Sequence, residues 1–164
     1  MVTEHRYVMR MADHLLDDLA KDAPAVLLVG PRASGKTTTA ARRVDAVVRL
    51  DDPAQRRAVA DNPDAVLASI AGSMLIDEWQ LVPEVLGAVK RAVDAGAPPG
   101  RFLITGSTRA DLQSEGWPNT GRVLRVALWP LTQREIVGRS ASPSLLDLLF
   151  DADWDAIGDR KSVV

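Results

Sequence analysis

The sequence predicts a three-layer α/β domain built on a parallel sheet. Short apolar segments recur at wide spacing along the 164 residues, and several are continuous apolar runs, as in strands buried on both faces. The material between them has helical patterning or opens with proline, which indicates that helices alternate with strands. The five expected strands are residues 25–29, 47–50, 73–76, 102–105 and 123–128.

The expected helices fill the intervals between these strands and the two ends of the chain. Pro53 and Pro83 each stand at the first position of a helical pattern, where proline is tolerated, and Gly96 is a plausible stop for the second of these helices. We expect helices at 4–20, from Thr37 toward the second strand, at 53–62, at 83–96 and at 145–157. The last of these carries an acidic run that we interpret as a solvated face.

Composition is that of one ordinary globular domain. Hydrophobic residues make up 46% and charged residues 26% of the chain, and domains average about 150 residues. We therefore expect an N-terminal helix in residues 1–22, the main domain in residues 23–140, and a C-terminal helix and tail in residues 141–164.

Charge and cysteine content exclude several classes of function. The net charge of −2, from 20 basic and 22 acidic residues, gives no support to nucleic-acid binding. The absence of cysteine excludes disulfides, thiolate metal sites and cysteine nucleophiles. The longest uncharged run, Ala65 to Ile76, is too short to cross a bilayer, and the charged N-terminus has no signal-peptide pattern. We expect a cytoplasmic protein with no membrane partner.

A phosphate-binding loop follows the first predicted strand. Residues 30–37 read GPRASGKT and fit G-x-x-x-x-G-K-[ST] at every fixed position. Gly30 and Gly35 allow a tight turn whose amide groups face phosphate oxygens, while Lys36 reaches the β- and γ-phosphates and Thr37 offers its hydroxyl to Mg²⁺. The motif follows a buried strand and opens a helix, which is the context it requires. The expected nucleotide-binding residues are Gly30, Pro31, Arg32, Ala33, Ser34, Gly35, Lys36, Thr37 and Thr38.

An acidic pair ends the third predicted strand. Asp77 fits the carboxylate that holds Mg²⁺ opposite a phosphate loop, together with Thr37. Glu78 stands one position further, where a carboxylate can orient and deprotonate a water aimed at the γ-phosphate. This second carboxylate favours hydrolysis of a nucleoside triphosphate over phosphoryl transfer to a metabolite. We expect Glu78 and Lys36 to act in catalysis.

Polar residues and arginines after the fourth strand complete the candidate set. Ser107 is the first candidate for a side chain that senses the γ-phosphate, with Thr105 and Thr108 behind it; simple turn chemistry is the alternative. Arg122 is the preferred candidate for a cation that stabilises the transition state, within the subunit or across an interface, and Arg109 is the second. A surface ion pair is the alternative for Arg122.

Five stretches together resemble a known family. They are LLVGPRASGKTT, LDDPAQRRAVADNP, LIDEWQLVPEVL, FLITGSTR and GRVLRVALWPLTQREI, which span about residues 26–136. In this order they resemble the prokaryotic AAA+-type ATPases whose full-length members carry a C-terminal domain of unknown function. The D-E-x-Q-x-x-P pattern that contains Gln80 and the L-x-P-L-T-x-x-E pattern that contains Glu135 are more specific than a phosphate loop alone.

This resemblance implies a five-stranded sheet in the order 5-1-4-3-2, ATP as the nucleotide and Mg²⁺ as the metal. Family members usually continue into a second domain beyond this region. The present sequence stops at Val164, so we expect that domain to be missing and turnover to be weak. The resemblance leaves the protein client and the oligomeric state open, a homo-oligomer included. The alternatives to an ATPase are a regulatory nucleotide-binding module without turnover and a small-molecule kinase. A third possibility is an ATPase linked to DNA, which the charge does not favour.

Overall fold

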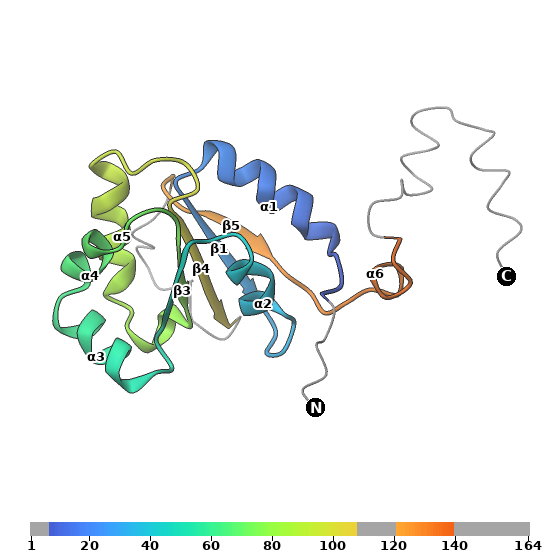
Figure 1. The fold of residues 1–164 in the computed structure, drawn as a ribbon, viewed down its shortest axis with the longest axis horizontal. Helices are drawn as coiled ribbons and strands as arrows, with labels where there is room; N and C mark the ends of the chain where they lie inside the picture. The colour runs from blue at the N-terminus through green and yellow to red at the C-terminus, as the bar shows by residue number, and fades with distance from the viewer. Residues whose placement is uncertain (1–6, 108–120, 140–164) are drawn as a thin grey trace, which may run out of the picture. The chain divides into compact units, whose positions relative to one another are not determined.

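The computed structural model describes residues 7–107 and 121–139, and its centre is a parallel five-stranded sheet (Figure 1). The sheet order is β2-β3-β4-β1-β5, which confirms the predicted order. The strands are β1 (Ala25–Gly30), β2 (Ala46–Arg49), β3 (Met74–Asp77), β4 (Phe102–Ser107) and β5 (Leu124–Ala127). Each expected strand is present, with ends shifted by one or two residues.

Strand β4 lies between β1 and β3, so three chain segments that follow these strands meet at one edge of the sheet. The register pairs Gly30 at the end of β1 with Ser107 at the end of β4. It also pairs Ile76, one residue before the end of β3, with Ile104. Because all pairings are parallel, the phosphate loop, the acidic pair and the end of β4 lie at the carboxyl edge, where open α/β sheets bind ligands.

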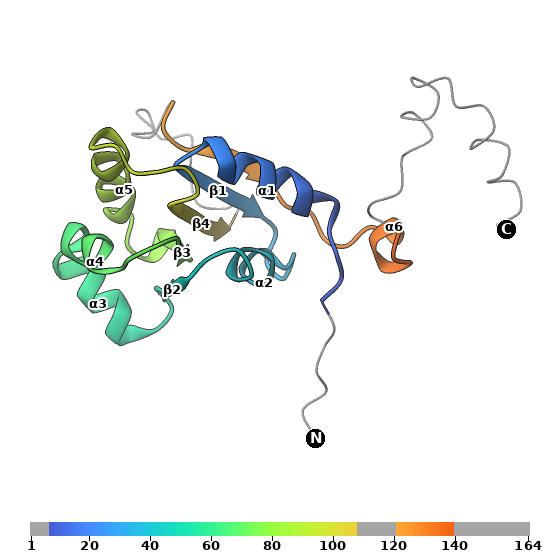
Figure 2. The same ribbon diagram turned by 45° about the horizontal axis from the view of Figure 1, so that its top comes forward.

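Helices cover both faces of the sheet, as the three-layer prediction requires (Figures 1 and 2). Alternate residues of β1 point to opposite faces, so Leu27 packs in one core and Leu28 in the other. The first core includes side chains of α3 (Pro53–Asp61), α4 (Pro63–Ser69) and α5 (Val85–Asp94). The second includes side chains of α1 (Met11–Asp22) and α2 (Lys36–Ala41).

Three expected helices are clearly shorter in the structure than in the sequence analysis. Helix α5 spans Val85–Asp94 rather than 83–96, so Pro83 lies in a turn before the helix instead of at its first position. Helix α1 begins at Met11 rather than residue 4, since residues 7–10 are not helical and residues 1–6 lie outside the described part of the chain. Helix α2 ends at Ala41, and the valines at 44, 47 and 48, whose β-branched side chains favour strands, follow before and within β2. The helix expected at 145–157 lies outside the described residues.

A capping signal that the sequence analysis did not use separates α3 from α4. Asp52 accepts hydrogen bonds from the backbone of α3, and Pro53 occupies its first turn. Asn62 and Pro63 repeat this arrangement ten residues later, with the Asn62 side chain accepting from the amide of Ala65. Proline at a first helical position and Asp or Asn as N-cap both favour a helix start. The pair Asn62-Pro63 therefore starts the helix α4, which was not predicted.

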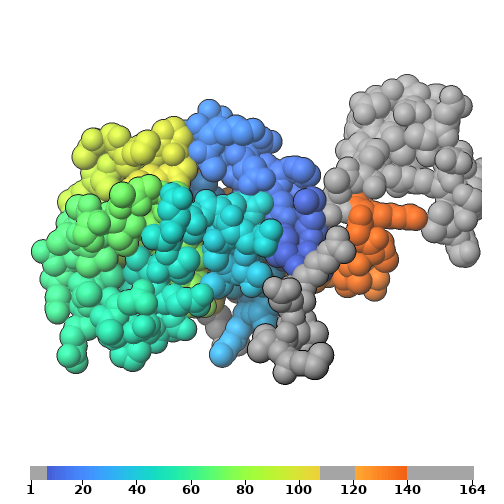
Figure 3. Space-filling view, viewed as in Figure 1, coloured from blue at the N-terminus to red at the C-terminus, as the bar shows by residue number. Residues whose placement is uncertain are grey.

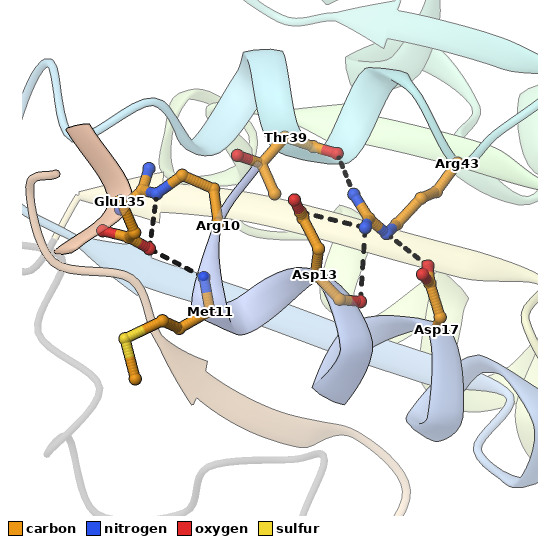
Figure 4. A network of polar contacts seen from close by, with 7 residues as sticks. All are labelled: Arg10, Met11, Asp13, Asp17, Thr39, Arg43 and Glu135. Atoms are coloured by element: carbon orange, nitrogen blue, oxygen red, sulfur yellow. Dashed lines mark hydrogen bonds and ion pairs between the residues drawn. The ribbon is translucent and has the colours of Figure 1, made fainter. Parts of the chain in front are cut away.

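Arginine 43 joins α1 to the end of α2 within the larger compact unit, Ala12–Leu131 (Figure 4). Its guanidinium contacts the carboxylates of Asp13 at 2.9 Å and Asp17 at 2.7 Å, and donates to the carbonyl of Thr39 at 2.8 Å. The fork of donors on arginine suits several acceptors at once. This network attaches α1 to the helix that follows the phosphate loop.

A second, smaller unit contains the described residues 7–11 and 132–139. Helix α6 (Gln133–Ile136), which was not predicted, begins with a capping box between Thr132 and Glu135. The buried Glu135 carboxylate also accepts from Arg10 Nε at 3.1 Å and the Met11 amide at 2.8 Å (Figure 4). Burial alone raises the pKa of Glu135, but these hydrogen bonds outweigh burial and hold its pKa below the ordinary value.

In residues 7–107 and 121–139, none of the helices has the length and apolarity needed to cross a membrane.

Candidate active site

The residues of the GPRASGKT motif form the end of β1, the loop that follows it and the start of α2. Lys36, the first residue of α2, is 6% exposed and its ammonium group donates to the carbonyls of Gly30 at 3.0 Å and Pro31 at 2.8 Å. These two bonds hold the ammonium against the loop between β1 and α2. A cation at this place lies where phosphate oxygens enter such a loop.

The two motif glycines are required for different reasons. Gly35 has φ of 89°, a left-handed conformation that favours glycine, and so makes the turn into α2 that the sequence analysis expected. Gly30 has no positive φ; instead, a Cβ there would lie 2.1 Å from the carbonyl oxygen of Leu128. Gly30 is therefore needed for close approach of the chain after β5, not for a turn.

Asp77 joins the phosphate loop to the end of β4 through its carboxylate. Thr37 Oγ1 donates to Asp77 Oδ1 at 2.8 Å, and the hydroxyl of Thr105 donates to the same oxygen. Asp77 is 4% exposed and Thr105 is fully buried. The structure thus brings together the two residues expected to hold the metal, and it assigns Thr105 to the support of Asp77.

The donor set at Thr37 and Asp77 suits Mg²⁺. Both residues supply hard oxygen atoms, and Mg²⁺ commonly takes one or two protein ligands and completes its shell with phosphates and water. Among residues 7–107 and 121–139, no group of three or more His, Cys, Asp or Glu side chains is arranged to hold a metal. A magnesium ion held by Thr37 and Asp77 would complete its shell with water and with oxygens of a bound nucleotide.

Glu78 and its neighbour Asp77 lie in different surroundings. It lines a cleft of about 940 Å³ at the carboxyl edge, whereas Asp77 is buried behind it. The cleft is lined by Pro31, Arg32, Ala33, Gly35, Lys36, Thr37, Thr38, Asp51, Glu78, Gln80, Leu81 and Ser107. The loop residues Arg32 and Ala33 are exposed, and this segment reaches the surface in the space-filling view (Figure 3). The adjacent carboxylates thus have separate environments.

Ser107 is the candidate sensor that faces the cleft. It ends β4, is half-buried, and pairs in register with Gly30, the first residue of the phosphate loop motif. Thr108 and Arg109 lie outside the described residues. The choice of Ser107 as the sensor stays a prediction.

Arg122 lies at the wrong edge of the sheet for a role at the phosphate loop of its own subunit. It precedes β5, which runs parallel to β1 with Leu124 opposite Val26. Four residues of strand, about 13 Å, separate Val26 from Gly30. Arg122 instead pairs with Asp94 at the end of α5. The expectation of a role within the subunit is corrected by this strand direction, and a role across an interface stays a prediction.

Three cleft residues had no assigned role in the sequence analysis: Asp51, Gln80 and Leu81. Gln80 belongs to the D-E-x-Q-x-x-P pattern, so its spacing from the acidic pair is the signal that could have found it. Asp51 follows β2, whose end lies beside Asp77 in the register. The expected strand order, with the second strand beside the third, is the signal that could have found it.

Comparison with known proteins gives a family and two relatives. A family model described as an AAA domain matches residues 22–137. The uncharacterised protein Rv2008c of Mycobacterium tuberculosis is 38% identical over 129 residues, which cover 75% of this chain and 29% of that protein. The uncharacterised protein Mb2031c of Mycobacterium bovis matches with the same identity and coverage. This chain therefore spans under a third of the length of these relatives.

Proposed function

Because this chain belongs to the AAA domain family of nucleotide-binding, ATPase-like proteins, we propose that it binds ATP with Mg²⁺ and hydrolyses it to ADP and phosphate. Binding would use the loop from Gly30 to Thr38. Chemistry would use the residues that follow β3 and β4 at the same edge.

The binding half of the proposal rests on the loop and its cation. Lys36 is held over the loop by two carbonyls, and a γ-phosphate entering the cleft would offer it a charged acceptor in their place. Thr37 and Asp77 would hold Mg²⁺ between the loop and β3. Bound Mg²⁺ would supply charge that bridges and neutralises the β- and γ-phosphates.

The hydrolysis half rests on one observation, the separation of the two adjacent carboxylates. Asp77 is buried against Thr37, while Glu78 lines the cleft. A carboxylate in the cleft can accept a proton from a water placed at the γ-phosphate. Ser107, at the end of the neighbouring strand, would contact that phosphate or that water.

The sheet order favours this proposal over a small-molecule kinase. In a kinase we would expect the phosphate-loop strand directly beside the strand that carries the acidic pair. Here β4 intervenes between β1 and β3. A module that binds nucleotide without turnover remains the second candidate, because the same loop and metal ligands would serve it.

Partners beyond the nucleotide follow only from the family. We propose that several copies of the chain assemble and that hydrolysis acts on a protein client.

Phosphate release by the purified protein tests the proposal. ATP with Mg²⁺ should give steady release that chelation of Mg²⁺ stops. Tight MgATP binding with no release above that of the Glu78→Gln protein would support the non-hydrolysing module. Release that depends on an added metabolite acceptor would support a kinase.

A further inference from the structure

The side chain of Gln80 is bonded to the carboxylate of Glu78. Gln80 Nε2 donates a hydrogen bond to Glu78 Oε2, and both residues line the cleft. A carboxylate has two oxygens, so a bond to Oε2 leaves Oε1 for another partner. This contact joins the proposed base to a residue that the mechanism has not used.

The backbone between these two residues is bent in a way that makes the contact. Glu78 has φ of 60° and ψ of 50°, a left-handed conformation uncommon outside glycine, and the short 3₁₀ helix η1 (Trp79–Leu81) follows at once. The amide of Glu78 donates to the hydroxyl of Thr105 at 3.3 Å. Strand β4 thereby supports the bend that places the side chains of residues 78 and 80 together.

The side chain of Gln80 also lies against β4, at Gly106. A Cβ at Gly106 would lie 2.3 Å from Trp79 Nε1 and 3.0 Å from Gln80 Oε1, so only glycine leaves room for both side chains. Trp79 is 7% exposed and belongs to the core. The side-chain amide of Gln80 thus has its oxygen next to Gly106 of β4 and its nitrogen bonded to Glu78. Gly106 directly precedes Ser107.

We propose that Gln80 is a positioning residue for Glu78: it holds Oε2 so that Oε1 faces the water that attacks the γ-phosphate. This inference rests on the proposed ATPase function. It also gives Gly106 a role, because the absence of a side chain there leaves the space that Gln80 occupies. Gln80 itself need not touch the nucleotide or the water. Its effect on turnover must therefore pass through Glu78.

The kinetic test replaces the donor while keeping the size of the side chain. Gln80→Met should leave the affinity for MgATP within threefold of the parent and lower kcat at least about tenfold, which is a part of the roughly 10²–10⁴-fold that a placed general base contributes. Equal kcat in Gln80→Met and parent would overturn the proposal.

Gln55 supplies a matched control. Its side-chain amide donates to the carboxylate of Asp52 at 3.2 Å, at the start of α3 and outside the cleft. Gln55→Met removes the same type of bond, and it should leave kcat unchanged. An equal loss of kcat in both variants would mean that the loss comes from general destabilisation, which would also contradict the proposal.

A measurement without turnover separates this inference from the proposed function. The ¹⁵N–¹H resonances of the Gln80 side-chain amide should move on Glu78→Ala, whereas those of Gln55 should not. If the parent releases no phosphate, the proposed function fails while a moved Gln80 resonance still supports the hold on Glu78. An unmoved Gln80 resonance would overturn that hold whether or not the parent is active.

Discussion

The hydroxyl of Thr37 donates a 2.8 Å hydrogen bond to the carboxylate of Asp77, forty positions further along the chain. One residue belongs to the phosphate loop and helix α2, and the other ends β3. Since β4 lies between β1 and β3 in the sheet, the bond joins segments that belong to two strands that are not neighbours. It brings two hard oxygen ligands to the place where Mg²⁺ would meet the phosphates.

Loss of either oxygen ligand should remove the increase in nucleotide affinity that Mg²⁺ gives. In Thr37→Val and in Asp77→Asn, we expect nucleotide affinity with Mg²⁺ to fall toward the affinity measured with a chelator. Calorimetric titration with ATP in both conditions measures this difference. A Mg²⁺-dependent gain that persists undiminished in both variants would move the metal site elsewhere.

Loss of the Glu78 carboxylate should stop hydrolysis and leave binding intact. Glu78→Gln keeps the shape of the side chain and removes the base, so MgATP affinity should match the parent while phosphate release is lost. Glu84→Gln is the control, because Glu84 is exposed and does not line the cleft. Equal turnover in parent and Glu78→Gln would place the catalytic base in another residue.

Arg122 should matter for chemistry only across an interface between copies. Arg122→Ala should retain nucleotide affinity and lose about 10³–10⁵-fold in turnover if the arginine reaches a neighbouring active site. Mixing it with Lys36→Ala protein should then restore part of the activity. Asp94→Ala breaks the same surface pair and should leave turnover unchanged. If Arg122→Ala turns over like an active parent, the arginine is only a surface partner of Asp94, in an exposed pair that adds little to stability.

Acid should destabilise the protein partly through Glu135. Its folded-state pKa is below the ordinary value of 4.5, so its contribution to stability is present above that pH and is lost as pH falls through the folded value. The free energy of unfolding should therefore fall more between pH 6 and pH 3 in the parent than in Glu135→Gln. Urea unfolding at several pH values measures both slopes. Identical slopes would show that the carboxylate contributes nothing that depends on pH.

Much of the fold could be predicted because local patterns and tertiary structure agree. The five apolar segments became the five strands, and GPRASGKT became the loop between β1 and α2. Helix α4 was missed because its main signal is the cap at Asn62 and Pro63, and the residues that follow have no clear helical periodicity. Helix α6 is four residues long and depends on a capping box rather than on an apolar face.

Sequence motifs were enough to predict several residues of the site, but not how these residues are arranged in space. Spacing identified Lys36, Thr37 and Asp77, and the structure brings them to one edge of the sheet. The place of Arg122 could not be read from spacing, since it depends on the direction of β5 beside β1. The contact of Gln80 with Glu78 depends on a left-handed residue that is not glycine, and sequence patterns give no warning of that conformation.

The affinity of the Lys36→Ala protein for MgATP tests the central claim most directly. Lys36 is the cation held within the phosphate loop, while Lys90 on α5 lies outside the cleft and serves as the matched control. Lys36→Ala should abolish binding or weaken it severely, and Lys90→Ala should bind as the parent does. A dissociation constant for Lys36→Ala within threefold of the parent, about 0.65 kcal/mol, would contradict the assignment of the nucleotide to this loop.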